Sequence, residues 1–598
     1  MAKIIKIGLI AALLITTQLF AQNISDEKYK LADSYEKSGD LKNASRLYEE
    51  LLKSNPKVEK YFQGLVRTYK AQNKFSELLP IVENQIELNP KSVNYTLLGE
   101  LLWRAGKTDE ANNSWDKALT VKTDNIAQSF IDVAQAQLGL KLFDKAIATI
   151  QKCRKELAKP NFLAEEMSQL YIATGKYDKG TDEVFKLYNE SSNLPQVEGK
   201  LQALMTNNEA ITYIHEVLKR KTKESNDLNY LRLFAWFLRA SKEYQEAYNI
   251  NLQIDQLVKA NGREMLNFAE ESRRDSEFDI ALKAFAYIID KGKENPYLMN
   301  ALFGYARTLE QKLNTTDKIS SEFINSIIER YRNIIKDFPN TTTSFDCQYR
   351  IAFMYLNYFD EKDKAINELK SIIESKVAGV TAASASILLG DIYVLMDKLD
   401  EAEKVFFDVT NKFKKISFPE FDKAKFKIAE IEYFRGNIDS AKVLFGEISV
   451  NSSSDVANNA LDKITLIEQN KIEQNIFAIY TKAELKERQK NTIEAINLFK
   501  QTIELAKEGS LVELCYIKIA LLNKNRLMYE ESISTLNSLL EKIPDTIYGD
   551  YVLLLIGDTY CALLKNELAI KSYTEILTKY PRSIYLQQAR DKIRKLRS

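Results

Sequence analysis

Apolar and small residues recur along this chain in a pattern that predicts pairs of helices. Two amphipathic helices are predicted in residues 26–56, with apolar positions at Leu31, Ala32 and Tyr35 in the first and at Leu41, Ala44, Tyr48 and Leu51 in the second. Between them, Gly39 is suited to a left-handed helix C-cap and Asp40 to an N-cap. Pro56 then ends the second helix, because proline cannot donate to the helical hydrogen-bond ladder.

The same pattern returns at intervals of one helix pair. The small residue Ala44 has its first equivalents at successive steps of 34, 33, 35 and 34 residues. The equivalents are Leu78, Ala111, Ala146, Gly180, Ala247, Ala281, Ala365, Ala402, Ala441, Ala495, Ser532 and Ala569. A helix pair of this kind cannot bury its own apolar face and needs a neighbour of the same shape. The period therefore predicts a solenoid built from one repeated unit.

Two stretches carry a resemblance to a known family. They are "LLGDIYVLMDKLDEAEKVFFDV" (388–409) and "LIGDTYCALLKNELAIKSYTEILTKYP" (555–581), which resemble the tetratricopeptide repeat in their Gly, Tyr, Ala and aromatic positions. The resemblance implies an all-α, right-handed superhelical solenoid of about fifteen helix–turn–helix units with a C-terminal capping helix. The closing "YPRSIYLQQARDKIRKLR" resembles the last units of exported bacterial repeat proteins of the TolA-binding and outer-membrane-assembly kind.

Three segments depart from the regular repeat. They are a degenerate unit at 195–227, a stretched unit at 296–345 and an inserted helix near 450–475. The predicted organisation is a signal peptide at 1–21, an N-terminal solenoid at 22–295, the irregular unit at 296–345, and a C-terminal solenoid at 346–598 that ends in a capping helix at 583–598.

The first residues have the three parts of a secretory signal. Lys3 and Lys6 precede the apolar core Ile7–Ile15, and Leu19 and Ala21 provide the −3 and −1 positions for cleavage before Gln22. No cysteine follows the core, so a lipid anchor is not expected, and the apolar stretch at 551–557 is far below membrane length. We expect a periplasmic protein, with secretion as the alternative, and no transmembrane segment in the mature chain.

Composition narrows the class of protein further. A chain of 598 residues with only 10 Pro and 19 Gly has few helix breakers, which favours a nearly all-helical fold. The 84 Lys and Arg residues balance 83 Asp and Glu residues. The formal net charge is therefore only +1, too small to give a field that would hold nucleic acid or an anionic membrane.

Candidate catalytic chemistry is sparse. The chain has one histidine, His215, which argues strongly against His-based dyads and His-rich metal sites and favours a structural role. Glu271 and Ser272 form a dipeptide of the kind found in lytic transglycosylases, but that family's downstream motif is missing and an ordinary repeat occupies the segment. We expect no enzyme activity, no cofactor and no metal site.

The four cysteines are Cys153, Cys347, Cys515 and Cys561. Each unit of a solenoid contacts only its neighbours, and only Cys515 and Cys561 fall in adjacent units. A disulfide between those two stays open, but we expect four unpaired thiols that behave as small apolar residues.

Partner binding is the remaining role for the surface. The resemblance implies that ligands bind the concave face formed by the first helices of the units. The candidate residues there are Lys60, Arg67, Lys70, Trp103, Arg232, Trp236, Arg239, Arg263 and Arg273. Arginine and tryptophan often anchor interfaces. Alternatively, Trp236 packs between units and the arginines pair with acids such as Glu270.

Two functions follow from this surface. The first is a non-catalytic exported scaffold that binds proteins or peptides on its concave face and helps to assemble or maintain a cell-envelope complex. The alternative is a protein that binds cell-wall glycan such as peptidoglycan, with exposed aromatic rings stacked on sugars.

Overall fold

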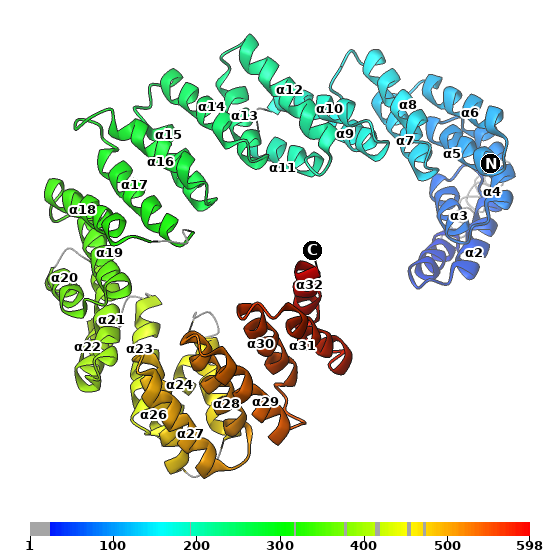
Figure 1. The fold of residues 1–598 in the computed structure, drawn as a ribbon. Helices are drawn as coiled ribbons and strands as arrows, with labels where there is room; N and C mark the ends of the chain where they lie inside the picture. Colours follow the sequence, from blue (N-terminus) through cyan, green and yellow to red (C-terminus); the bar gives the residue numbers. More distant parts are fainter. Residues whose placement is uncertain are drawn as a thin grey trace, which may run out of the picture. The chain divides into compact units, whose positions relative to one another are not determined.

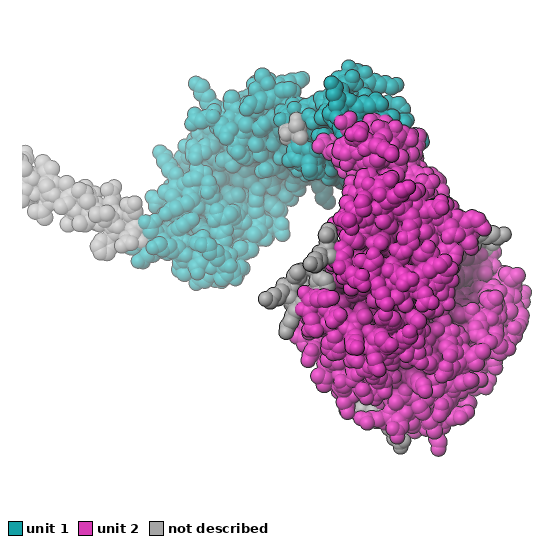
Figure 2. Space-filling view, turned by 90° about the vertical axis from the view of Figure 1, so that its left-hand side faces the viewer, with its two compact units in different colours: residues 1–260 teal, residues 261–598 magenta. Residues whose placement is uncertain are grey.

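The computed structural model describes residues 24–191, 193–315, 319–375, 379–412, 419–450, 456–470 and 474–597. All regular secondary structure in these residues is α-helix. The chain divides into two compact units, residues 1–260 and 261–598, which Figure 2 colours separately. The predicted signal peptide at 1–21 lies outside the described residues, and the predicted irregular segment at 296–345 lies inside unit 2.

Unit 1 is a stack of antiparallel helix pairs (Figure 1). It begins with a helix at residues 24–37. The helices that follow are α2 (Leu41–Ser54), α3 (Glu59–Ala71), α4 (Phe75–Leu88), α5 (Ser92–Arg104), α6 (Thr108–Thr120), α7 (Ile126–Gly139), α8 (Phe143–Glu156), α9 (Ala164–Ala173), α10 (Tyr177–Ser191), α11 (Leu194–Leu204), α12 (Asn208–Glu224), α13 (Leu228–Ala240) and α14 (Tyr244–Leu257).

Unit 2 continues the same architecture (Figure 1). Its helices are α15 (Arg263–Arg274), α16 (Phe278–Ile289), α17 (Leu298–Leu313), α18 (Ser321–Asp337), α19 (Thr342–Tyr358), α20 (Lys362–Glu374), α21 (Gly379–Leu395), α22 (Leu399–Lys412), α23 (Pro419–Phe434), α24 (Ile438–Ser449), α25 (Ala457–Gln469), α26 (Gln474–Arg488), α27 (Thr492–Ala506), α28 (Ser510–Asn525), α29 (Tyr529–Lys542), α30 (Gly549–Ala562), α31 (Asn566–Lys579) and α32 (Leu586–Arg597).

The first pair shows how the sequence sets the turn. Gly39 has a φ of 83°, in the left-handed region that glycine adopts without strain. Asp40 is the N-cap of α2, and its side chain accepts a hydrogen bond from the Asn43 amide. α2 ends at Ser54, two residues before Pro56. The break and the two caps predicted at 38–40 are therefore confirmed.

Within each unit, the first helices of successive pairs lie side by side. In unit 2, α15 contacts α17, α17 contacts α19, α19 contacts α21 and α21 contacts α23. We call the surface formed by these helices the first-helix face of unit 2. The described residues form seven helix pairs in unit 1 and eight in unit 2. The prediction of an all-α solenoid with about fifteen helix pairs is therefore confirmed.

The repeat phase read from the sequence matches the core. Every equivalent of Ala44 named above is buried, from Leu78 in α4 to Ala569 in α31. Four residues after several of these positions stands a buried aromatic ring, such as Tyr48, Trp115, Phe285, Phe406 and Tyr573. The small residue lets two helices approach closely, and the ring fills the space beside them. The core is thus a chain of similar clusters repeated along each unit.

An additional helix interrupts the pairing in unit 2. α25 follows α24 directly, and α26 nevertheless packs against the first helix α23. Arg488 at the end of α26 donates to Glu430 of α23 at 2.9 Å and to Asp391 of α21 at 2.7 Å. Lys463 of α25 lies 2.8 Å from Glu484. These charged bonds join α21, α23, α25 and α26 across the insertion.

Hydropathy along the helices argues against an integral membrane segment in the described ranges. None of the helices there is long enough and apolar enough to span a bilayer.

Candidate partner-binding surface

The basic residues predicted for the second repeat are all ion-paired. Lys60 lies 2.9 Å from Asp26, and Lys70 lies 2.6 Å from Glu100. Arg67 makes a two-pronged bond to Glu36 at 2.7 and 2.9 Å, which is the main cause that holds the pKa of Glu36 below its usual value. These cations therefore tie neighbouring repeats together.

Pairs of the same spacing recur in both units. Each joins a lysine to a carboxylate about one repeat away, and the examples are Lys91–Glu59, Lys176–Asp144, Lys200–Glu165, Lys312–Asp279 and Lys592–Asp558. Partly exposed pairs of this kind contribute about 0–1 kcal/mol each. A cation that is paired in this way has little charge left for a partner, so a binding site must be sought where cations exceed carboxylates.

The predicted tryptophans are half-buried. The Trp103 ring stacks on the buried Trp115 ring at 5.8 Å between centroids, and the Lys145 ammonium lies 5.5 Å from its centre. Trp236 lies on α13, between Arg232, which is exposed, and Arg239, which is half-buried. Part of the Trp103 ring surface is thus covered by contacts within the protein.

The strip predicted around Trp236 spans the boundary between the units. Arg232, Trp236 and Arg239 belong to unit 1, whereas Arg263 and Arg273 lie on α15 in unit 2. Each group is therefore described by itself, and the joint strip stays a prediction.

Arg273 begins a polar cluster on the first-helix face of unit 2. Its guanidinium lies 2.6 Å from Glu270, the acid named in the alternative interpretation, and donates to Gln311 of α17 at 2.9 Å. Arg263, at the start of the same helix, is exposed and lies 3.5 Å from Glu264. Of these two arginines, Arg273 is therefore the one that reaches the neighbouring repeat.

Two further arginines complete this cluster. Arg350 of α19 donates to Glu310 of α17 at 3.2 Å, and Glu310 also accepts the Tyr331 hydroxyl at 2.7 Å. Arg307 lies one helical turn before Glu310. Its Nε atom is buried and has no hydrogen-bond partner among the described residues. Arg273, Arg307 and Arg350, from three consecutive first helices, form what we call the arginine cluster.

The arginine cluster carries an excess positive charge. Glu270 bonds Arg273 and Glu310 bonds Arg350, whereas Arg307 makes no hydrogen bond or ion pair with a carboxylate of the described residues, although the charge of Glu310 acts on it. Burial, together with the positive charges of Arg350 and Arg273, lowers the pKa of Arg307 below that of an ordinary guanidinium. Such a group is stabilised by an added anion, and a guanidinium suits a carboxylate because it can bind both oxygens.

Arg307 and Arg350 were not among the residues predicted from the sequence. A signal for Arg307 was present, because Arg239, Arg273 and Arg307 follow one another at steps of 34 residues, the length of one repeat. Arg350 breaks this spacing by lying 43 residues after Arg307, across the stretched unit. The sequence alone could not show which of these arginines have carboxylate partners.

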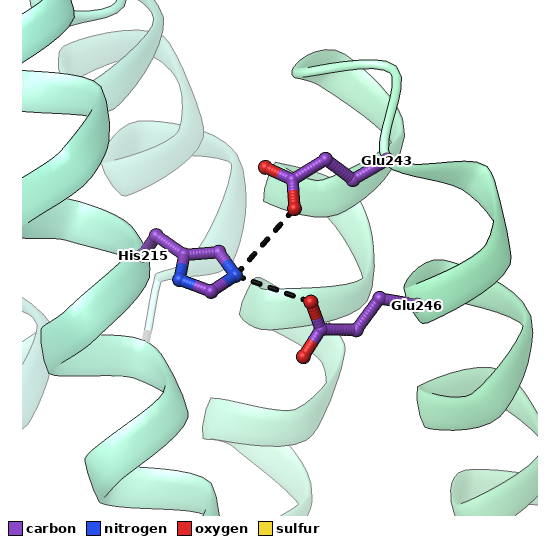
Figure 3. A group of neighbouring side chains, drawn as sticks. All are labelled: His215, Glu243 and Glu246. Carbon is purple, nitrogen blue, oxygen red and sulfur yellow. Dashed lines mark hydrogen bonds and ion pairs between the residues drawn. The ribbon is translucent and has the colours of Figure 1, made fainter.

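His215 has structural contacts, as expected for a single histidine. Its ring packs against Phe234 at 5.5 Å and Phe237 at 6.2 Å between centroids. Its Nε2 atom also lies near two carboxylates of the next helix pair, Glu243 and Glu246 (Figure 3). In the described part of the chain, this is the group with atoms placed to bind a metal ion.

The remaining sequence candidates are buried, except for the half-buried Cys561. Ser272, of the Glu–Ser dipeptide, is fully buried in α15. All four cysteines are free, with Cys153, Cys347 and Cys515 buried and Cys561 half-buried. The expectation of four unpaired thiols is confirmed.

Comparisons with known proteins agree with the repeat architecture. The tetratricopeptide repeat family model matches residues 28–57 and 551–583, which cover the first and last helix pairs. No curated protein matches the sequence. The repeat signature is thus carried at both ends of the array.

Solved structures similar to this chain include helical repeat proteins. A chain from the Naa15/Naa10 complex bound to HypK-THB is 14% identical, with 96% of each chain covered and a TM-score of 0.30. A tetratricopeptide repeat protein from Parabacteroides merdae is 13% identical over 50% of this chain and 99% of its own, with a TM-score of 0.29. Yeast Tom70 is 14% identical over 94% of this chain and 100% of its own, with a TM-score of 0.23. Values this low transfer no function to this chain.

Proposed function

We propose that this protein is a non-catalytic scaffold that binds acidic segments of partner proteins at the arginine cluster. The observation that supports this is the partly buried guanidinium of Arg307, which has no carboxylate partner among the described residues while both neighbouring arginines have one. A partner's Asp or Glu side chain would supply the missing charge. A carboxylate bound there would exchange water for charge-assisted hydrogen bonds.

A protein segment fits this surface because the cluster extends over several repeats. Arg273, Arg307 and Arg350 come from α15, α17 and α19, which lie side by side. An extended segment can cross these helices and place acidic side chains at successive steps, as peptides do in other helical arrays. The proposed partner is therefore an acidic stretch of polypeptide rather than a compact small molecule.

The scaffold is proposed to act outside the cytoplasm. The support is the sequence of residues 1–21, which has a basic start, an apolar core and a cleavage site before Gln22. In the periplasm, such a protein would assemble or maintain a cell-envelope complex. Intact-mass spectrometry of the native protein tests this location, and a mass that includes residues 1–21 or a lipid would contradict it.

Peptide binding tests the site directly. A fluorescent peptide of alternating Asp, Glu and Gly should bind the full chain, and a Lys-containing peptide of the same length should not. Arg307→Met should weaken binding about tenfold or more, since hydrogen bonds to charged groups contribute about 1.5–3 kcal/mol. The matched control is Arg590→Met, which removes an exposed arginine from α32 and should leave binding unchanged.

Circular dichroism of both variants shows whether each is folded, so that a loss of binding is not mistaken for unfolding. Equal binding of the acidic peptide by a folded Arg307→Met variant would overturn the proposed site. Sedimentation with purified peptidoglycan, without binding of acidic peptides, would instead favour the glycan-binding alternative.

A further inference from the structure

Three side chains in unit 1 converge on one small volume. His215 lies on α12, Glu243 is the N-cap residue of α14, and Glu246 lies in the first turn of α14. The His215 Nε2 atom is 3.2 Å from Oε2 of Glu246 and 3.6 Å from Oε2 of Glu243. Figure 3 shows both carboxylates directed at the same ring nitrogen.

Hydrogen bonding alone leaves this arrangement incompletely satisfied. A histidine Nε2 atom carries at most one proton, so it can donate to one carboxylate well but not to two. The Glu243 side chain also makes no capping bond to the α14 backbone, although it stands at the N-cap position. Glu246 is also bonded to Lys219, whereas Glu243, whose side chain is 42% exposed, lies beside a nitrogen that can serve only one of the two carboxylates.

A metal ion would satisfy all three groups at once. Zinc binds His nitrogen and carboxylate oxygen at about 2.0–2.2 Å, so two ligand atoms of a tetrahedral site lie about 3.3–3.5 Å apart. The two separations from His215, 3.2 and 3.6 Å, bracket this value, and the separation of the two carboxylate oxygens, within 4.8 Å, would shorten when an ion binds between them. The geometry points to a zinc site formed by His215, Glu243 and Glu246, with the fourth position open to water.

Neighbouring side chains hold the ligands in place. Lys219 of α12 lies 3.1 Å from Oε1 of Glu246, which leaves Oε2 directed at the histidine. Phe234 and Phe237 of α13 pack against the imidazole and fix its plane. Outer contacts of this kind are typical of metal ligands.

Zinc at this position would join consecutive repeats. α12 and α14 are the second helices of successive pairs, and α13 lies between them in sequence. The ion would therefore join the predicted degenerate unit at 195–227, which contains His215, to the repeat that follows it. This inference concerns unit 1 and is independent of the proposed peptide site in unit 2.

Calorimetric titration of untagged protein with zinc tests the site. The tag must be absent because His215 is the only histidine of the chain, and a polyhistidine tag would bind zinc itself. With excess magnesium present to occupy scattered carboxylates, we expect one tight equivalent per chain. His215→Gln and Glu246→Gln should each weaken it about tenfold or more. The matched control Glu216→Gln, an exposed acid on α12, should not.

Two measurements keep the result unambiguous. The single imidazole gives one set of ring proton resonances in NMR spectra, and these should shift on addition of one equivalent of zinc. The Cys561→Ser variant, which lacks the half-buried thiol, should bind zinc as the parent does. Absence of saturable binding, an unshifted imidazole, or a tight equivalent retained in His215→Gln would each overturn the zinc site.

Discussion

The ring of Tyr48 occupies the space into which any side chain at Gly64 would project. A β-carbon on Gly64 would lie 2.5 Å from Cε1 of Tyr48, far inside van der Waals contact. The same relationship recurs between Gly304 and Phe285, where the distance would be 2.3 Å. Glycine in these first helices is thus required by the aromatic ring of a second helix.

Gly64→Ala should destabilise unit 1. The added methyl group would displace a fully buried ring, and overpacking of this kind costs about 1–3 kcal/mol. The matched control is Gly199→Ala on α11, where an added β-carbon would meet nothing within 4 Å. That change should stabilise by up to about 1 kcal/mol through helix propensity. Thermal melts followed by circular dichroism should move in opposite directions, and a parallel decrease would contradict the packing argument.

Leu564→Gly should stabilise unit 2. Leu564 stands in the turn before α31 with a φ of 59°, and its side chain is 86% exposed, so it is strained without packing in return. Gly39 fills the corresponding position before α2. A left-handed residue other than glycine costs about 1 kcal/mol. The reverse change, Gly39→Leu, should lower the melting temperature, and a stabilising Gly39→Leu would refute this explanation.

The fold was predictable from the sequence because the repeat is local. Helix periodicity, Asp40 as a cap and the small residue at Ala44 are all visible within one unit, and repetition confirms the phase. Leu564 and similar residues were harder to interpret, because they occupy a glycine position without being glycine. Their conformation is imposed by the packing of the two helices that they connect, which overrides local preference.

The buried pair of Arg154 and Glu183 should be strongly coupled. Arg154 of α8 donates twice to Glu183 of α10, at 2.8 and 2.7 Å, and the two side chains are only 9% and 4% exposed. Arg154→Met would leave the buried carboxylate of Glu183 paired only with Lys186, at 2.8 Å, and should cost up to about 3–5 kcal/mol. Hydrogen exchange of α8 and α10 peptides should report this as faster local opening. Adding Glu183→Gln should restore part of the loss, and strictly additive effects would exclude coupling.

Acid should weaken the charged bonds around the inserted helix. Burial raises the pKa of Glu430, but Lys427 and Arg488 outweigh it, so the net pKa is below the ordinary 4.5. A lowered folded-state pKa means that stability is present above pH 4.5 and is lost as the pH falls through the folded-state pKa. Exchange protection of α21, α23 and α26 should therefore decrease below about pH 4.5.

Glu430→Gln should reduce this acid response. The variant should be less stable at neutral pH, because Lys427 and Arg488 lose a partner, and should change less on acidification. Glu401→Gln, an exposed acid on α22, should behave as the parent. An unchanged acid profile in Glu430→Gln would show that other carboxylates control the transition.

The thiols should differ in reactivity only while the protein is folded. Burial raises the pKa of Cys153, Cys347 and Cys515 above the usual range, so their reactive thiolates are scarce as well as inaccessible. Cys561 is half-buried and should react first with a thiol reagent. Denatured, unreduced protein should react with four equivalents in total, and two would reveal a disulfide.

The binding surface was less predictable than the fold. Repeat position indicated that Arg67 and Arg273 lie on first helices, but charge pairing decides which cations remain available. The partners of Arg67 and Arg350 lie on neighbouring repeats, at separations of 31 and 40 residues. Such pairings depend on side-chain reach between helices, which periodicity does not specify. His215 was interpreted alone for the same reason, since Glu243 and Glu246 belong to the next repeat.

The inserted helix α25 bears on how a chain of this kind can lengthen. In a strict alternation of first and second helices, one additional helix would exchange the roles of every helix after it. Yet α26 packs against α23 as a first helix, and the alternation resumes through α31. The order of first and second helices is therefore restored immediately after α25, and bonds such as that of Arg488 to Glu430 hold α26 in the first-helix position. Such an array can grow by a single helix during evolution, and duplication of a whole repeat is not the only route to a longer protein.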